Sequence, residues 1–205
     1  MVSLQKLLSL AAIGSGVRAS APVVTDSPKG AKYSAEFEKG VVSGEIDFSS
    51  SSNGSVSVNV DLSGLPSVGG PYKYHVHQLP VPSDGNCNGT KLHLNPYNGN
   101  PNATQPNELE VGDLSGRHGV LTYTDSKVSY VDDYISLNED NKAFIGGLSV
   151  VIHFSNDTRL ACANITSNSS SSSSTVASAE ENAGNLLTSS SMFLAGVSVI
   201  TALLI

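Results

Sequence analysis

The sequence predicts an all-β domain, either a β-sandwich or a Greek-key barrel. Apolar and polar residues alternate along YSAEFEKGVVSGEIDFS (33–49) and SVSVNVDLSGLP (55–66), as they do in strands with one buried face. One face of the second stretch carries four apolar residues, Val56, Val58, Val60 and Leu62. Glycine and proline interrupt the gaps between such stretches, and the central region shows no long helical period.

The N-terminus has the features of a secretory signal peptide over residues 1–19. Lys6 precedes an apolar run over residues 7–13, and small residues follow, with Ala19 as the expected last residue before cleavage. Removing this segment takes away Lys6 and Arg18 and leaves nine basic against 18 acidic residues, a net charge of −9. We expect no nucleic-acid partner for so acidic a chain.

The C-terminal part predicts a stalk followed by a lipid-attachment signal. Residues 167–182 are rich in serine and too polar to form a core, so we expect a disordered stalk. Residues 183–205 combine small residues, a polar spacer and an apolar tail, the order of a GPI-attachment signal, with Asn182 as the expected attachment residue. The tail, 192–205, is short for a membrane span of roughly 20 residues, and a retained tail anchor is the alternative. The expected tether is to the plasma membrane, the cell wall or both.

Between these ends we expect one globular domain over residues 28–166. Further strand-like stretches are GVLTYTD (119–125), KVSYVDDYISL (127–137) and AFIGGLSVVIHF (143–154). In a secreted chain, Cys87 and Cys162 predict one disulfide that closes a long loop. Six sequons are candidates for N-glycosylation: Asn53, Asn88, Asn102, Asn156, Asn164 and Asn168.

Two histidines in PYKYHVHQLP indicate a metal site. On a strand His75 and His77 point to one face and Val76 to the other, and no carboxylate lies between them, which suits a transition metal with nitrogen ligands. A chance pair on a strand is the alternative. His93 and His153, which ends a β-branched run, bring the number of histidines at strand or loop edges to four of the five in the chain.

Five motifs follow one another along the chain: YHVHQLP, GNCNGTKLHLNP, VGDLSG, GGLSVVIH and TRLACANI. In this order they resemble the copper/zinc superoxide dismutase family across most of residues 35–166. The resemblance implies an eight-stranded Greek-key β-barrel with a disulfide from Cys87 to Cys162, and Arg159 as the residue that guides superoxide to the metal. It also implies that copper is held by four histidines, His75, His77, His93 and His153.

The chain departs from the family pattern at the zinc site. In the family His93 would bridge copper to zinc. Two further zinc histidines would stand where this chain has Pro101 and Glu110, and only Asp113 matches a zinc ligand. We therefore expect one copper ion and no zinc, as in the copper-only superoxide dismutases of the fungal cell surface. Only FSNDT (154–158) replaces a long charged loop of the family, so we expect the copper to be open to solvent.

Three residues near the motifs are candidates for catalysis. Without zinc, Glu110 is expected to accept a hydrogen bond from the far nitrogen of His93, and Asp113 to do the same for a copper histidine. The alternatives are a solvated carboxylate for Glu110 and a turn cap for Asp113. Arg159 is expected to act as a local positive charge for an anionic substrate.

The fifth histidine lies in an apparent insertion, SGRHG, after the VGDL motif. We expect His118 and Arg117 to be exposed turn residues without a catalytic role, and a role for Arg117 at the rim of the site is the less favoured alternative.

The sequence thus predicts a monomeric extracellular enzyme that converts superoxide to dioxygen and hydrogen peroxide. A cell-surface protein that stores or binds copper without turnover is the first alternative, and a structural wall glycoprotein is the second. The presence of Arg159 favours the enzyme, because a copper store has no need of a positive charge beside the metal.

Overall fold

The structure, a computed structural model, describes residues 20–168 of the chain. The predicted signal peptide, most of the predicted stalk and the GPI-attachment signal lie outside these residues. The described residues contain seven strands and three short helices: β1 (Lys32–Phe37), β2 (Ser43–Ser50), β3 (Val56–Ser63), β4 (Lys73–His77), β5 (Ser126–Asp132), β6 (Ser149–His153), β7 (Arg159–Ser167), η1 (Cys87–Thr90), η2 (Pro106–Glu108) and α1 (Leu114–His118).

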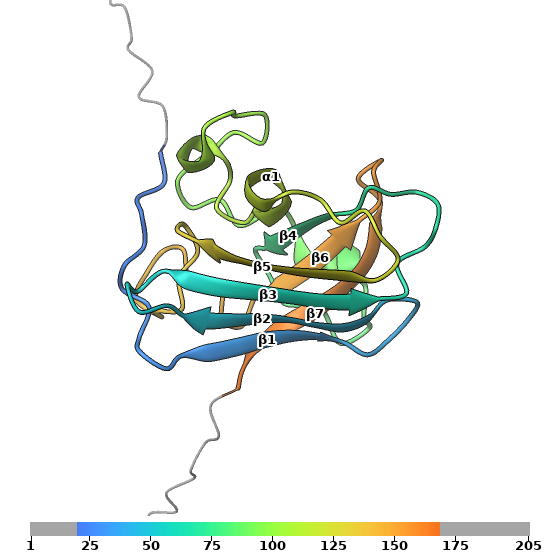
Figure 1. Cartoon of the computed structure of the whole chain (residues 1–205), viewed down its shortest axis with the longest axis horizontal. Coiled ribbons are helices and arrows are strands. Elements are labelled where there is room, and N and C mark those ends of the chain that lie inside the picture. Colours follow the sequence, from blue (N-terminus) through green and yellow to red (C-terminus); the bar gives the residue numbers. More distant parts are fainter. Residues whose placement is uncertain (1–19, 169–205) are drawn as a thin grey trace, which may run out of the picture. The chain divides into compact units, whose positions relative to one another are not determined.

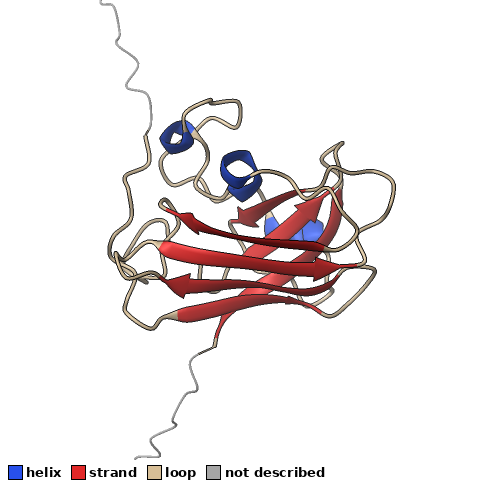
Figure 2. Ribbon diagram, in the orientation of Figure 1, coloured by secondary structure: helices blue, strands red, loops and turns tan. Residues whose placement is uncertain are grey.

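The seven strands form one antiparallel sheet in the order β4-β6-β7-β1-β2-β3-β5. The sheet curls, so that β1, β2, β3 and β5 make one layer and β4, β6 and most of β7 cross behind it (Figure 1; Figure 2). The layers are joined where the end of β7 pairs with β1, with Tyr33 opposite Ser167. The chain passes between the layers from β3 to β4 and from β4 to β5, as a Greek-key arrangement requires. The predicted all-β fold is confirmed.

The described residues hold seven strands, where the resemblance implies eight. A segment over residues 111–121 runs along the free edge of β4 instead: Val76 N–H donates to Gly112 O (2.9 Å), and Tyr72 and Leu121 exchange two backbone bonds (2.8 and 2.9 Å). Between these contacts the segment winds into the five-residue helix α1. It therefore covers the edge of β4 without forming a continuous strand.

The core lies between the two layers. The four residues predicted to share one face of β3 are buried, at 2 % exposure or less, which confirms the predicted alternation. From the other layer, β4 contributes Tyr74 and Val76, so its two histidines occupy the opposite face, as predicted. Each fully buried side chain of this size stabilises the fold by about 1.5–3 kcal/mol relative to leaving it in water.

The folded domain extends beyond the predicted bounds at both ends. Ala21 and Val24 are buried, and their backbone N–H groups donate to Asn107 O (2.8 Å) and Asp133 O (2.7 Å). At the other end Asn168 N–H donates to Lys32 O (2.9 Å), so the first two residues of the predicted stalk belong to the fold. Within residues 20–168, no helix has the length and apolar character needed to cross a membrane.

The prediction that Arg117 and His118 are exposed turn residues is wrong, because both lie in helix α1 with side chains that are 2 % and 17 % exposed. Arg117 Nε donates to Oδ2 of the fully buried Asp132 (2.8 Å). His118 Nε2 contacts the same oxygen at 2.8 Å, and its ring stacks on Tyr130. The short insertion therefore turns inward, because Asp132 at the end of β5 needs partners of this kind to be buried.

Asp132 is held ionised by these partners. Burial alone would raise its pKa, but the hydrogen bond from His118, the charge of Arg117 and the backbone N–H groups of Ile135 and Tyr134 lower the pKa to about 2. The Arg117 guanidinium also donates to the carbonyls of residues 110 (2.8 Å) and 111 (2.5 Å). One buried ion pair therefore fixes the end of β5, helix α1 and the segment before it.

We expect Asp132→Asn to lower the free energy of unfolding by about 3–5 kcal/mol, because it leaves the Arg117 charge buried without a counter-ion. Chemical denaturation of the two proteins at neutral pH measures this difference. The difference should narrow as the pH falls from about 4 towards 2, since the carboxylate contributes its stability above its unfolded pKa and loses it on protonation. Asp61→Asn, which breaks the exposed pair with Lys127, is the control and should change stability little. Equal losses from both substitutions would contradict the structural role of Asp132.

Candidate metal centre

Four histidines from three parts of the chain converge on one point. His75 and His77 project from β4, and His153 ends the neighbouring strand β6. His93 comes from the loop after η1, where it forms an isolated bridge with His77. One ligand nitrogen from each ring lies within 4.8 Å of all the others. Within residues 20–168 these four form the single group of His, Cys, Asp or Glu side chains that converges closely enough to hold a metal ion.

Three of the four rings are buried. His75, His77 and His153 are 4 %, 1 % and 5 % exposed, whereas the His93 side chain is 25 % exposed. Burial lowers the pKa of His77 to about 3 and that of His153 to about 4, and it also lowers the pKa of His75. These rings are therefore neutral at physiological pH, and each has a lone pair for a metal. The predicted exposure to solvent is found at His93 alone.

Two of the rings are oriented by backbone carbonyls. His77 Nδ1 lies 3.0 Å from Lys91 O, and His153 Nδ1 lies 3.0 Å from Asp157 O. A carbonyl can only accept, so each Nδ1 carries the proton and each Nε2 keeps its lone pair. The two Nε2 atoms face each other at 3.2 Å, as expected of nitrogens directed at a shared ion.

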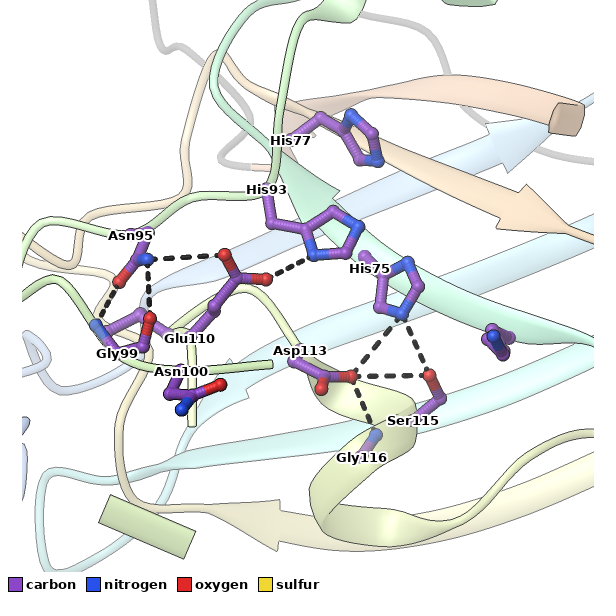
Figure 3. Close-up of polar contacts among 12 residues, drawn as sticks. His75, His77, His93, Asn95, Gly99, Asn100, Glu110, Asp113, Ser115 and Gly116 are labelled. Carbon is purple, nitrogen blue, oxygen red and sulfur yellow. Dashed lines mark hydrogen bonds and ion pairs between the residues drawn. The ribbon is translucent and has the colours of Figure 1, made fainter. Parts of the chain in front are cut away.

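His75 has the opposite orientation. Its Nε2 lies 3.1 Å from Ser115 Oγ and 3.3 Å from Asp113 Oδ1, and its Nδ1 is buried without a hydrogen-bond partner. Asp113 also accepts from Gly116 N–H (2.7 Å) and caps helix α1 (Figure 3). Although burial opposes its ionisation, the hydrogen bond from His75 lowers the pKa of Asp113. Asp113 therefore does both things that the sequence left as alternatives: it caps a turn and it orients a histidine.

His93 is oriented by a carboxylate. Its Nδ1 lies 2.5 Å from Glu110 Oε2, while Asn95 Nδ2 donates to Glu110 Oε1 at 3.2 Å (Figure 3). The Glu110 side chain is 16 % exposed, so it is not the solvated carboxylate of the alternative interpretation. An ionised carboxylate only accepts, so His93 keeps its Nε2 lone pair for the metal.

The donor set fits copper. Four imidazoles with fixed tautomers offer one Nδ1 and three Nε2 lone pairs, and the unpartnered Nδ1 of His75 is a buried polar atom that a metal would satisfy. Imidazole suits copper and zinc alike, but of the family's four zinc ligands this chain keeps only His93 and Asp113. The Asp113 carboxylate is bonded to His75, and Glu110, at the position of a lost zinc histidine, is bonded to His93. Pro101, at the other lost zinc position, is exposed in a turn.

Arg159 begins β7 next to His153. Its guanidinium donates to the carbonyls of Cys87 and Lys91 and to Thr90 Oγ1 (3.2 Å). The predicted disulfide between Cys87 and Cys162 is confirmed, and it joins η1 to β7. The arginine is thus held by the same turn that orients His77.

The segment FSNDT forms a tight turn between β6 and β7. Phe154 N–H donates to Thr158 O (2.8 Å), and Lys73 Nζ contacts Asp157 Oδ1 at 2.6 Å. This turn supplies the carbonyl that orients His153. A segment of five residues therefore replaces a longer loop and still fixes a ligand.

Sequence reasoning missed three residues that contact the site: Thr90, Asn95 and Ser115. Asn95 lies two residues after His93, and Ser115 lies two after Asp113, so both are close in sequence to residues that the motifs single out. Small polar residues are common in loops, so this signal alone does not single them out.

Comparisons with known proteins agree with this geometry. Residues 42–180 match the family described as copper/zinc superoxide dismutase (SODC). The chain is 50 % identical over 169 residues to "Cell surface superoxide dismutase [Cu-Zn] 4" and 52 % identical over 149 residues to "Cell surface Cu-only superoxide dismutase 5", both of Candida albicans. These alignments cover 81 % and 71 % of this chain and 71 % and 65 % of the relatives.

A solved structure is similar as well. It is described as Candida albicans Superoxide Dismutase 5 (SOD5), Cu(II), and it matches with a TM-score of 0.66 and 47 % identity over 78 % of this chain and 99 % of that one. A family match over more than half of the sequence, relatives at 50 % identity and four converging histidines lead to one conclusion. The chain belongs to the copper/zinc superoxide dismutase family.

Proposed function

We propose that this protein is an extracellular superoxide dismutase that works with one copper ion and no zinc. The observation that carries the proposal is the bond between Glu110 and His93 Nδ1, because in zinc-containing members of the family this nitrogen would bind zinc. One similar protein is named as a Cu-Zn enzyme and another as Cu-only. The residues of this chain support the second description.

The residues around the copper site prepare it for electron transfer. When bound, copper supplies reversible one-electron chemistry, which dismutation needs because one superoxide is oxidised to dioxygen and another is reduced to peroxide. Four fixed tautomers keep the ligand lone pairs directed at the same point. Glu110 would also stabilise an imidazolium if His93 Nε2 took up a proton, so the pair can hold one of the protons that the peroxide product requires.

Arg159 would attract the substrate. Its charge is held beside the site in a protein that carries a net charge of −9 after removal of the first 19 residues, so it is a local positive focus for an anion. A copper-storage protein on the same fold remains the alternative function. Fixed orientation of the arginine by three acceptors favours the enzyme, because storage needs no substrate guidance.

Secretion and cell-surface attachment complete the proposed function. The similar proteins are named as cell-surface enzymes, and all six predicted N-glycosylation sites carry exposed asparagines. The signal peptide, the stalk and GPI attachment at Asn182 rest on the sequence patterns. We propose that the protein is a monomer, that a GPI lipid links it to the plasma membrane, and that it can be transferred from this lipid to cell-wall glucan.

The first test is dismutation by the secreted protein loaded with copper under zinc-free conditions. We expect fast turnover that added zinc does not increase, because within residues 20–168 the four copper histidines are the one group that converges on a metal position, and the outer nitrogen of His93 is bonded to Glu110. Stopped-flow decay of superoxide and metal analysis of the same sample measure both quantities. Stoichiometric copper without turnover would identify a copper store, and activation by zinc would contradict the copper-only site.

We expect Glu110→Gln to lower the dismutation rate by about 10- to 100-fold, because it removes the carboxylate that holds the Nδ1 proton of His93. The rate constant of the copper-loaded variant checks this. Glu139→Gln, at an exposed carboxylate outside the site, is the control. A Glu110 variant as fast as the control would show that the bond has no part in turnover.

We expect Arg159→Gln to lower the second-order rate constant by about 10-fold and to flatten its dependence on ionic strength, because the positive focus is lost. Arg159→Lys keeps the charge and should retain the salt dependence, although it cannot bind the same carbonyls in a fork. Rates measured over a range of salt concentrations separate the two effects. Identical salt dependence in the Gln variant and the wild type would rule out electrostatic guidance by this residue.

A further inference from the structure

We propose that Asn95 is a positioning residue that sets the direction of the Glu110–His93 hydrogen bond. The inference rests on the proposed function, in which His93 is a copper ligand. Asn95 does not contact the four converging nitrogens itself and acts through Glu110 (Figure 3).

The orientation of the Asn95 amide is fixed by three bonds. Its Oδ1 accepts from Gly99 N–H (2.6 Å), while its Nδ2 donates to Gly99 O (2.9 Å) and to Glu110 Oε1 (3.2 Å). A flipped amide would set Nδ2 against an N–H donor and Oδ1 against two acceptors. The side chain therefore presents a donor, and never an acceptor, to Glu110.

The two oxygens of Glu110 have separate partners. Oε1 accepts from Asn95, and Oε2 accepts from His93 Nδ1. Because one oxygen is anchored, the carboxylate is held with the other facing the histidine. Loss of the anchor would free the carboxylate to rotate away from a ring that is itself partly exposed.

Asn95 also ties together the two chain segments on which this arrangement depends. One segment follows His93 and contains Gly99, and the other carries Glu110. Gly99 packs so closely on the second segment that an added Cβ would lie 2.2 Å from Leu109 O and 2.7 Å from Glu110 N. Next to it, Asn100 N–H donates to Glu108 O (2.7 Å). Asn95 thus links the chain that follows His93 to the chain that carries Glu110, a connection that zinc would make in zinc-containing members of the family.

The fixed direction of these hydrogen bonds predicts how Glu110→Gln changes the tautomer of His93. Asn95 Nδ2 needs an acceptor, so it would bond to the amide oxygen of the new Gln and leave the Gln amide NH2 group facing His93 Nδ1. His93 would then have to accept at Nδ1 and carry its proton on Nε2, the nitrogen intended for copper. Adding Asn95→Asp turns the Gln amide around. The aspartate accepts from the Gln amide NH2 group, and the Gln amide oxygen accepts from His93 Nδ1–H, as Glu110 does in the wild type.

The experiment reads the His93 tautomer in the copper-free protein by NMR of isotopically labelled histidine nitrogens at neutral pH. We expect Nδ1–H in the wild type, Nε2–H in E110Q and a return to Nδ1–H in the double variant N95D/E110Q. N95A alone should give a mixture of tautomers and, after copper loading, about 10-fold slower dismutation. N95A also serves as the fallback if the double variant does not fold.

Asn100→Ala is the matched control, because it removes an exposed side-chain amide from the same loop. The Asn100 amide oxygen accepts from Asn102 N–H, whereas the hydrogen-bond partners of the Glu110 carboxylate are His93 and Asn95. It should leave the tautomer and the rate unchanged. The same tautomer in E110Q and N95D/E110Q, or a wild-type spectrum in N95A, would overturn the proposal.

The tautomer is read without copper or turnover, so the two proposals can fail separately. The expected tautomer pattern with no dismutation by the copper-loaded wild type would retain the role of Asn95 and reject the enzyme. Fast wild-type dismutation with an unchanged tautomer in every variant would retain the enzyme and reject the role of Asn95.

Discussion

The structure around the metal centre depends on one constraint: each of four histidines must present an unprotonated nitrogen to the same point. A neutral imidazole has one donor and one acceptor nitrogen, so the inward lone pair exists only if the outward nitrogen has a fixed acceptor. Backbone carbonyls serve His77 and His153, and carboxylates with their partners serve His75 and His93. The site is therefore as much a set of acceptors as a set of ligands.

The fold supplies these acceptors from elements that have little else in common. The disulfide and Arg159 hold the turn after η1, and the short turn between β6 and β7 offers the carbonyl of Asp157. Near Glu110, the Arg117 guanidinium donates to the carbonyls of residues 110 and 111 and is paired with the buried Asp132. A strained or loose acceptor would release its histidine, so the rigidity of these turns is a functional requirement as well as a structural one.

Replacement of a zinc site by hydrogen bonds changes what the surrounding residues must do. A zinc ion would place a positive charge on the outer nitrogen of His93 and displace its proton. Glu110 places a negative charge beside the same nitrogen, which keeps its proton and donates it in a hydrogen bond. The loop between His93 and Glu110 must then be held by side-chain amides and close backbone packing, as at Asn95 and Gly99. Several hydrogen bonds, each of which depends on its geometry, thus hold the loop in place of one metal ion.

The sequence by itself determined the all-β class, the inward face of β3 and the shared face of His75 and His77, because a strand has a period of two and these relations are local. The motif order indicated the other two histidines, the disulfide and Glu110 as the partner of His93. Only the tertiary structure decided that Arg117 and His118 turn inward to Asp132, that the edge of β4 is covered by a segment with a helical turn, and that Asn95 and Ser115 join the site. These contacts join residues whose separation and orientation depend on how the loops pack, and no local pattern encodes that packing.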